Sequence, residues 1–138
     1  MKNTVFLFLF PLISHAVAYG QEIIPIQNIA NLARTNSATA KEQYMGKTIQ
    51  FTGVVVDTGM SRFLTPYVDL SDRVGGNKMA RCVLPYGGIT RGRGQLSDFS
   101  VGQTVTMSGR VQAVFENDGN NYPNISYGIL TKDSKLVE

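Results

Sequence analysis

The sequence has very few of the residues that build disulfides and zinc sites. Its 138 residues include one cysteine, Cys82, and one histidine, His15. A single cysteine cannot form an internal disulfide, and one cysteine with one histidine cannot supply the four ligands of a structural zinc site. These absences exclude a disulfide scaffold and a zinc module. The sequence predicts no metal and no cofactor.

Candidate acids, bases and nucleophiles are scarce as well. If residues 1–18 are removed, as argued below, no histidine remains. Asp57, Asp72 and Asp98 fall at expected strand ends or in loops, where aspartate is ordinary. No serine or threonine has a recognisable base to activate it, and the glycines of residues 87–94 are not followed by the Gly-Lys-Ser/Thr of a phosphate loop. We therefore predict that the protein is not an enzyme; a hydrolase with paired carboxylates stays open as an alternative.

The N-terminus has the pattern of a signal peptide. Lys2 gives a positive start, residues 4–13 read TVFLFLFPLI, and Ala16-Val17-Ala18 is a small-residue cleavage pattern. The apolar run is shorter than the about 20 residues that a membrane-spanning helix needs. We predict a signal peptide at 1–18, cleaved after Ala18 or alternatively after Gly20, and a periplasmic or secreted protein. An uncut N-terminal anchor is the alternative. No cysteine follows the cut to carry a lipid, so no stable membrane anchor is expected.

The charge is nearly balanced overall but is uneven along the chain. The net charge is +3 for the whole sequence, and loss of Lys2 lowers it by one unit. Residues 73–93 carry no acid and five cations, namely Arg73, Lys78, Arg81, Arg91 and Arg93. Such a local cluster can create a positive surface field. Cys82 lies in this stretch within the apolar run Cys82-Val83-Leu84, which favours a buried thiol. Pairing of Cys82 between two chains is the alternative.

Residues 23–44 have the periodicity of one or two short helices. Ile26, Ile29, Ala30 and Ala33 recur at three- and four-residue spacing. Asn36 interrupts the pattern and offers an N-cap, although residues 39–42 also fit a capping box. Gly46 stands where a left-handed helix end is expected. We expect residues 19–47 to form an N-terminal helical segment that packs on a barrel made by residues 48–138.

From Thr48 onward the apolar period changes to two, which is typical of strands. The pattern predicts strands at 48–56, 67–70, 79–84, 104–115 and 125–131, and one helical turn at 96–99. Gly53 and Gly109 interrupt the two long strands, as glycines do at bulges and barrel corners. The predicted fold is mainly β: a five-stranded OB-like Greek-key barrel preceded by one or two short N-terminal helices.

With these elements in place, the sequence resembles the tRNA-anti-like OB-fold family of small exported or lipoprotein domains in bacteria. The resemblance runs from about Ile29 to Thr131. It rests on Ala40, Tyr44-Met45-Gly46-Lys47, Ile49 and Phe51-Thr52-Gly53-Val54, on Ala80-Arg81-Cys82-Val83-Leu84, and on Leu96, Phe99 and the run Gly102–Gly109. In this family the last strand often holds a second cysteine. Residues 125–129 have none, so the family disulfide is not expected here. The name of the family does not establish RNA binding.

An OB barrel binds its ligands on the face of its second and third strands and on the adjoining loops. In this chain that surface maps to Arg62, Phe63, Tyr67, Arg81, Tyr86, Arg91, Arg93 and Tyr122. Aromatic rings mixed with arginines suit single-stranded nucleic acid; alternatively, Phe63 and Tyr67 cap the barrel and the loop arginines aid solubility.

The expected compartment decides between the ligands. A protein outside the cytoplasm rarely meets nucleic acid. Our first hypothesis is therefore a non-enzymatic binding module for a protein partner or a small envelope ligand. The second is a single-stranded nucleic-acid-binding protein of the envelope, acting for example in DNA transfer or uptake.

Overall fold

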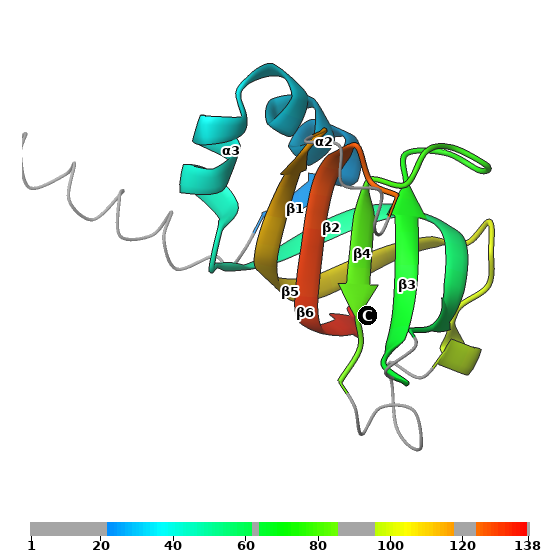
Figure 1. The fold of residues 1–138 in the computed structure, drawn as a ribbon. Helices are drawn as coiled ribbons and strands as arrows, with labels where there is room; N and C mark the ends of the chain where they lie inside the picture. The colour runs from blue at the N-terminus through cyan, green and yellow to red at the C-terminus, as the bar shows by residue number, and fades with distance from the viewer. Residues whose placement is uncertain (1–21, 62–63, 86–95, 118–123, 138) are drawn as a thin grey trace, which may run out of the picture.

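Five strands of the chain close into a barrel, and two helices lie at one end of it (Figure 1). The computed structural model describes residues 22–61, 64–85, 96–117 and 124–137. The predicted signal peptide at 1–18 lies outside the described residues. The barrel strands are β2 (Thr48–Met60), β3 (Pro66–Ser71), β4 (Ala80–Val83), β5 (Thr104–Glu116) and β6 (Tyr127–Leu136).

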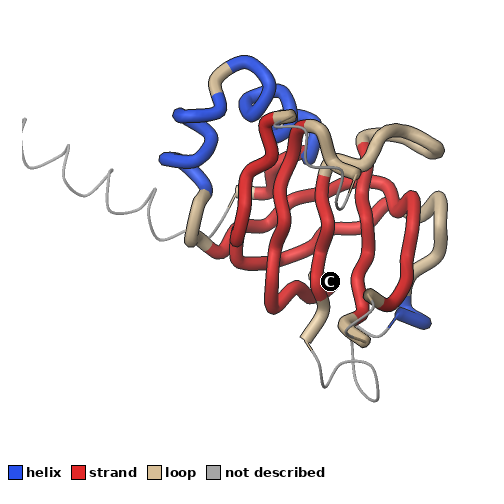
Figure 2. Tube along the Cα trace, viewed as in Figure 1, coloured by secondary structure: helices blue, strands red, loops and turns tan. Residues whose placement is uncertain are grey.

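The pairing of these strands is that of an OB barrel. The sheet runs in the order β2-β3-β4-β6-β5, and β5 pairs with β2 to close it (Figure 2). All neighbours in the closed barrel are antiparallel except β4 and β6, which pair in parallel with Ala80 opposite Ile129. The predicted five-stranded Greek-key barrel is confirmed.

The N-terminal segment contains a short strand that the sequence did not predict. β1 (Ile23–Pro25) pairs in parallel with the first half of β2, with Ile23 opposite Gln50. We expected helix from residue 23. Pro25 explains the difference, because a residue before proline is pushed toward extended backbone. Pro25 itself is extended and stands as the N-cap of the first helix.

The N-terminal segment, predicted to form one or two short helices, forms two. They are α2 (Ile26–Thr35) and α3 (Ser37–Tyr44). The side chain of Asn36 accepts a hydrogen bond from the Thr39 amide at 3.1 Å, so Asn36 is the N-cap of α3. Gly46 has a φ of +78°, the left-handed conformation expected at that helix end. The buried side of α2 consists of Ile26, Ile29, Ala30 and Ala33.

Two strands are longer than the sequence predicted. β2 continues to Met60, which pairs with Pro66, and β6 continues to Leu136, which pairs with Met107. Their last residues are mostly polar, so the apolar alternation that marks a strand fades before the strand ends. The hydrogen bonds to neighbouring strands, which the sequence pattern does not report, maintain the extended conformation there.

Glycines allow close approach at both bent strands. A Cβ atom on Gly109 would lie 2.8 Å from the Thr131 Cβ and 2.9 Å from the Ser134 Oγ. The register of β5 against β6 shifts between Ser108 and Arg110, so the bulge predicted at Gly109 is confirmed. In β2 the shift lies between Val55 and Asp57, beyond Gly53. Gly53 instead makes room for neighbours, because its Cβ would lie 2.9 Å from the Ser71 carbonyl oxygen.

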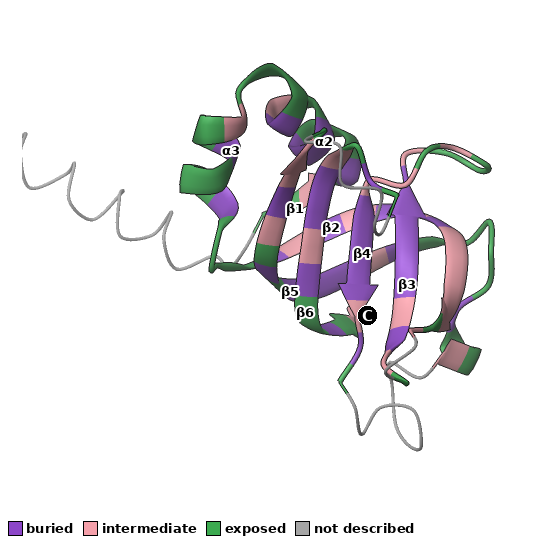
Figure 3. Ribbon diagram, viewed as in Figure 1, coloured by how far each residue is buried: buried purple, intermediate pink, exposed green. Residues whose placement is uncertain are grey.

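The barrel interior is filled by apolar side chains from every barrel strand. Figure 3 shows the buried stretches of the strands in purple. Those with no exposed surface include Phe51, Val68, Leu70, Met107 and Ile129. Cys82 also has no exposed surface, which confirms the prediction of a buried thiol. None of the helices in the described ranges is long and apolar enough to cross a membrane.

The tight packing at Gly109 gives a stability prediction. Replacing Gly109 by alanine should lower the free energy of unfolding by about 1–3 kcal/mol, because the added methyl group overpacks the contact with Thr131 and Ser134. Urea denaturation followed by circular dichroism measures this loss. The control is Gln112→Ala on the same strand, an exposed position where a change within about 0.5 kcal/mol is expected. Equal stability of the two variants would show that the contact is not tight.

Candidate functional site

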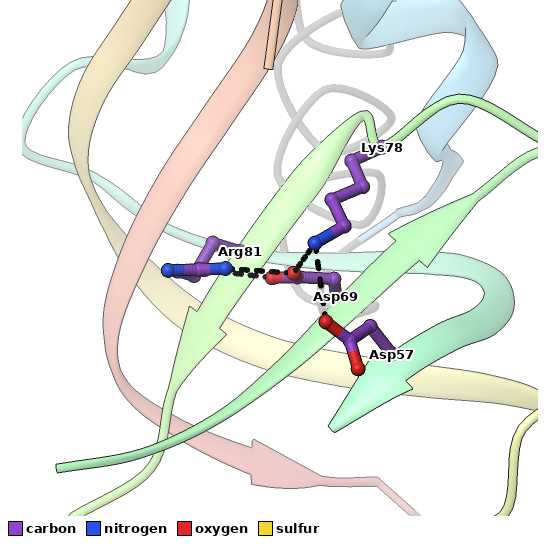
Figure 4. Close-up of polar contacts among 4 residues, drawn as sticks. All are labelled: Asp57, Asp69, Lys78 and Arg81. Atoms are coloured by element: carbon purple, nitrogen blue, oxygen red, sulfur yellow. Dashed lines mark hydrogen bonds and ion pairs between the residues drawn. The ribbon is translucent and has the colours of Figure 1, made fainter. Parts of the chain in front are cut away.

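The outer face of β3 and β4 carries a cluster of charged side chains. Val68, Leu70 and Cys82 belong to the buried core. Because successive side chains of a strand point to opposite faces, Asp69 and Arg81 lie on the outer side of the barrel wall. They stand opposite each other on the two paired strands. Two further charged groups, Asp57 of β2 and Lys78 just before β4, complete the cluster (Figure 4).

Asp69 and Arg81 form a two-pronged ion pair. The Arg81 Nε lies 2.8 Å from Oδ1 of Asp69, and the Arg81 Nη2 donates to Oδ2 at 2.9 Å. Fork-shaped pairing of this kind is the strongest geometry for arginine and carboxylate. Asp69 is completely buried and Arg81 is 6% exposed. The positive charge of Arg81 is therefore neutralised in place and withdrawn from solvent.

Lys78 bridges the two carboxylates. Its Nζ lies 3.0 Å from Oδ2 of Asp69 and 3.1 Å from Oδ2 of Asp57. Partial burial lowers the pKa of Lys78, but the hydrogen bonds and charges of Asp69 and Asp57 outweigh that effect, so the pKa is raised above its ordinary value. The stabilisation from this shift is complete below the unfolded pKa of about 10.4 and is lost as the pH rises through the folded value. Two cations thus balance two carboxylates across this face.

The ring of Tyr67 contacts the same cluster through Arg81. The guanidinium carbon of Arg81 lies 3.8 Å from the centre of the Tyr67 ring, a cation–π contact. Across the sheet Tyr67 stands opposite Gly59, where a Cβ atom would lie 2.8 Å from the tyrosine hydroxyl oxygen. The ring therefore lies over Gly59 and against Arg81. One surface that could stack on a ligand is already covered by the protein.

The structure brings together two of the eight residues that the sequence suggested for ligand binding. Tyr67 and Arg81 contact each other, and Arg81 also pairs with Asp69. The other six lie outside the described residues and remain predictions: Arg62, Phe63, Tyr86, Arg91, Arg93 and Tyr122.

The sequence analysis missed the roles of Asp57, Asp69 and Lys78. The alternation of Tyr67-Val68-Asp69-Leu70 places Asp69 on the outer face. Its partner, however, depends on the register between β3 and β4. The long turn between these strands does not fix that register in sequence. The sequence pattern could therefore predict the face on which Asp69 lies, but not its pairing with Arg81.

The described residues include neither a metal-ligating cluster nor a reactive thiol. Among residues 22–61, 64–85, 96–117 and 124–137, no group of three or more His, Cys, Asp or Glu side chains is placed to hold a metal ion. Burial raises the pKa of the Cys82 thiol to about 12, despite a hydrogen bond with Thr131 that lowers it. A thiol of that kind stays protonated and is a poor nucleophile.

The buried ion pair gives a second stability prediction. Asp69→Asn removes the counter-charge of buried Arg81 and should lower the free energy of unfolding by about 3–5 kcal/mol. Asp57→Asn is the matched control. It also removes a carboxylate that pairs with Lys78, but the Asp57 side chain is 43% exposed. The expected loss in the free energy of unfolding is therefore below about 1 kcal/mol. Urea titrations of the two variants measure the difference. Similar losses would mean that the Asp69–Arg81 pair is not buried as described.

Known proteins share this architecture. A lipoprotein from Klebsiella pneumoniae, named for an inferred nucleic-acid-binding role, superposes with a TM-score of 0.62 at 19% identity, covering 90% of this chain and 97% of that one. An aspartyl-tRNA synthetase from Leishmania major gives a TM-score of 0.49 at 13% identity, covering 86% of this chain but 21% of the synthetase. The first likeness shows the fold alone, and the second is too weak to carry an argument. No curated protein is detectably similar in sequence.

The family model provides the more specific match. It covers residues 22–121, a range that includes both helices, the charged cluster on β3 and β4, and all of β5. The residues that carried the resemblance in the sequence, from Ala40 to Gly109, all fall within that range. The chain belongs to the tRNA_anti-like family of OB-fold binding domains.

Proposed function

We propose that this protein is an exported, non-enzymatic OB-fold module that binds a protein partner or a small envelope ligand. The observation that carries the proposal is the charge balance on the β3–β4 face. There Arg81 is held by Asp69, and Lys78 is held by Asp69 and Asp57. A face of this kind does not offer the uncompensated positive charge that nucleic acid requires.

The physics of nucleic-acid binding explains why this observation supports the proposal. Affinity for a phosphate backbone comes largely from cations that replace its counterions. Single-stranded binding adds stacking of bases on aromatic rings. Arg81 would have to leave its buried carboxylate to reach a phosphate, and buried Asp69 would lose its two-pronged partner and keep only its contact with Lys78. Tyr67 would have to lose its contact with Arg81 before that side of its ring could stack on a base.

Export is supported by the first eighteen residues. A positive residue, a short apolar core and the Ala16-Val17-Ala18 pattern are what signal peptidase recognises. The structural neighbour from Klebsiella pneumoniae is named as a lipoprotein. A lipoprotein is an envelope protein, so its match over most of both chains agrees with an envelope role for this one.

Single-stranded nucleic-acid binding in the envelope is the second candidate function. It is favoured by the inferred role in the name of the same neighbour and by Arg62, Arg91 and Arg93 in the sequence. In this alternative the arginines of the loops would carry the binding, and the β3–β4 cluster would have a structural role.

An oligonucleotide titration separates the two functions. Protein purified from the periplasm is titrated against a fluorescent 20-nucleotide single strand at about 50, 100 and 200 mM KCl, and anisotropy is read. We expect weak binding, with a dissociation constant above about 100 µM near physiological salt, and little change with salt because few phosphates are neutralised. A pull-down from envelope extract then searches for the partner.

The contrary outcome is equally specific. Tight binding that falls steeply with salt, and that Arg91→Ala with Arg93→Ala removes, would replace the proposed function by the second candidate. The matched control is Arg73→Ala with Arg110→Ala, which removes the same charge from exposed positions outside that loop. Equal loss in both double variants would indicate non-specific attraction to the whole positive surface.

A further inference from the structure

A polar cleft opens at the end of the barrel that carries α2. Its volume is about 430 Å³, within the range of small-molecule sites. Its lining residues come from α2, from the connection between β3 and β4, and from the start of β6 and the residues just before it. These segments lie near one another at this end of the barrel (Figure 1). The residues that line it are Ala30, Asn31, Arg34, Gly76, Asn77, Lys78, Met79, Asn124, Ser126 and Tyr127. Lys78 is the residue that this cleft shares with the charged cluster on β3 and β4.

The backbone holds the walls of the cleft in place. The Met79 amide donates to the Leu70 carbonyl at 2.8 Å, and the Ile129 amide donates to the Met79 carbonyl at 3.0 Å. Gly128 has a φ of +154°, and a Cβ atom there would collide with the Met79 carbonyl oxygen. Glycine at this position lets the start of β6 lie directly against Met79. Such a wall is formed before any ligand arrives, which reduces the entropy cost of binding.

The third wall is the exposed side of α2. Asn31 and Arg34 are three residues apart, so their side chains are neighbours on the helix surface. Ala30, one residue before Asn31, is buried together with Ile26, Ile29 and Ala33. The helix is therefore anchored by its apolar side, and Asn31 and Arg34 line the cleft beside Ala30.

The lining combines neutral hydrogen-bonding groups with apolar surface. Asn31, Asn77 and Asn124 are exposed and each offers both donors and an acceptor, while Ser126 adds a hydroxyl. Met79 and Tyr127 are half-buried and supply apolar surface. Side chains that both donate and accept hydrogen bonds are suited to the hydroxyl groups of a ligand, because a hydroxyl also donates and accepts hydrogen bonds.

Arg34 supplies the uncompensated charge of the cleft. No carboxylate is among the described residues that line it. The ammonium of Lys78 is drawn away between Asp57 and Asp69, so Lys78 contributes mainly its aliphatic stem. Arg34 is exposed and makes no ion pair with any residue in the described ranges. Its planar fork is suited to a carboxylate or a phosphate.

We propose that this cleft binds a small acidic saccharide, a sugar unit that carries a carboxylate or a phosphate. Arg34 takes the anionic group, the three asparagines and Ser126 take sugar hydroxyls, and Tyr127 with Met79 contacts the carbon side of the ring. The inference rests on the proposed function and names a ligand class for it. A nucleic-acid strand fits less well, because binding along its backbone needs several cations.

An NMR titration tests the assignment. Amide shifts of uniformly ¹⁵N-labelled protein are followed while galacturonic acid, glucose 6-phosphate, neutral glucose or adenosine monophosphate is added. We expect the two acidic sugars to shift amides of Asn31, Asn77 and Ser126 with dissociation constants on the order of 1 mM, as suits ligands of this size. Neutral glucose should bind at least about tenfold more weakly, because it lacks the charge-assisted hydrogen bonds. Stronger binding by one acidic sugar identifies whether the anion is a carboxylate or a phosphate.

Variants at two exposed arginines complete the test. Arg34→Gln should weaken binding of the acidic sugar by at least about tenfold. Arg110→Gln removes the same charge from β5, where Arg110 pairs with Asp133, and should leave binding unchanged. Equal binding of neutral glucose, shifts confined to another face, or equal loss in both variants would overturn the proposal.

The two failures are distinguishable. If no sugar shifts the cleft amides, this inference falls, and the proposed function still depends on the oligonucleotide titration and the pull-down. If adenosine monophosphate binds the cleft best and single strands bind tightly, both fall together.

Discussion

The buried pairing of Asp69 with Arg81 is the constraint on which the functional surface depends. It lies between two neighbouring strands, on the face where OB barrels usually meet their ligands. Removing two charges from water is costly, and only close two-pronged geometry offsets the cost. Once formed, the pair fixes the positions of its neighbours. Tyr67 packs on the guanidinium, and Lys78 is drawn toward the shared carboxylate.

This constraint changes how the charges of the sequence should be interpreted. Residues 73–93 contain five cations and no acid, so the stretch looks strongly positive by itself. In the folded chain Asp69 and Asp57 come from neighbouring strands and balance Lys78 and Arg81. The nearby cation that keeps its charge uncompensated in the described ranges is Arg34, which belongs to a helix distant in sequence. A charge run along the chain is therefore a poor guide to the charge of a surface.

Much of the fold could be predicted because it depends on local patterns. Period-two apolar residues marked every barrel strand, Asn36 and Gly46 marked the ends of α3, and Gly109 marked a bulge. β1 was missed because three residues carry too little pattern, and the ends of β2 and β6 were missed because polar outer residues conceal a strand.

The site was less predictable. The sequence suggested Tyr67 and Arg81 as ligand-binding residues, which stays a prediction. The pairing of Arg81 with Asp69 depends on strand register. The cleft joins α2, the β3–β4 connection and β6, three segments that only the folded chain brings together. Long-range contacts of this kind leave no spacing that could be found in the sequence.

The most direct test of the central claim is a double-mutant cycle on the ion pair. The free energies of unfolding of Asp69→Asn, Arg81→Gln and the double variant are compared with that of the unaltered protein by urea denaturation. A pair that is buried and mutually dependent should give a coupling energy of about 2 kcal/mol or more. Losses that simply add, within about 0.5 kcal/mol, would mean that Arg81 does not depend on Asp69. Arg81 would then be available to a ligand, contrary to this account.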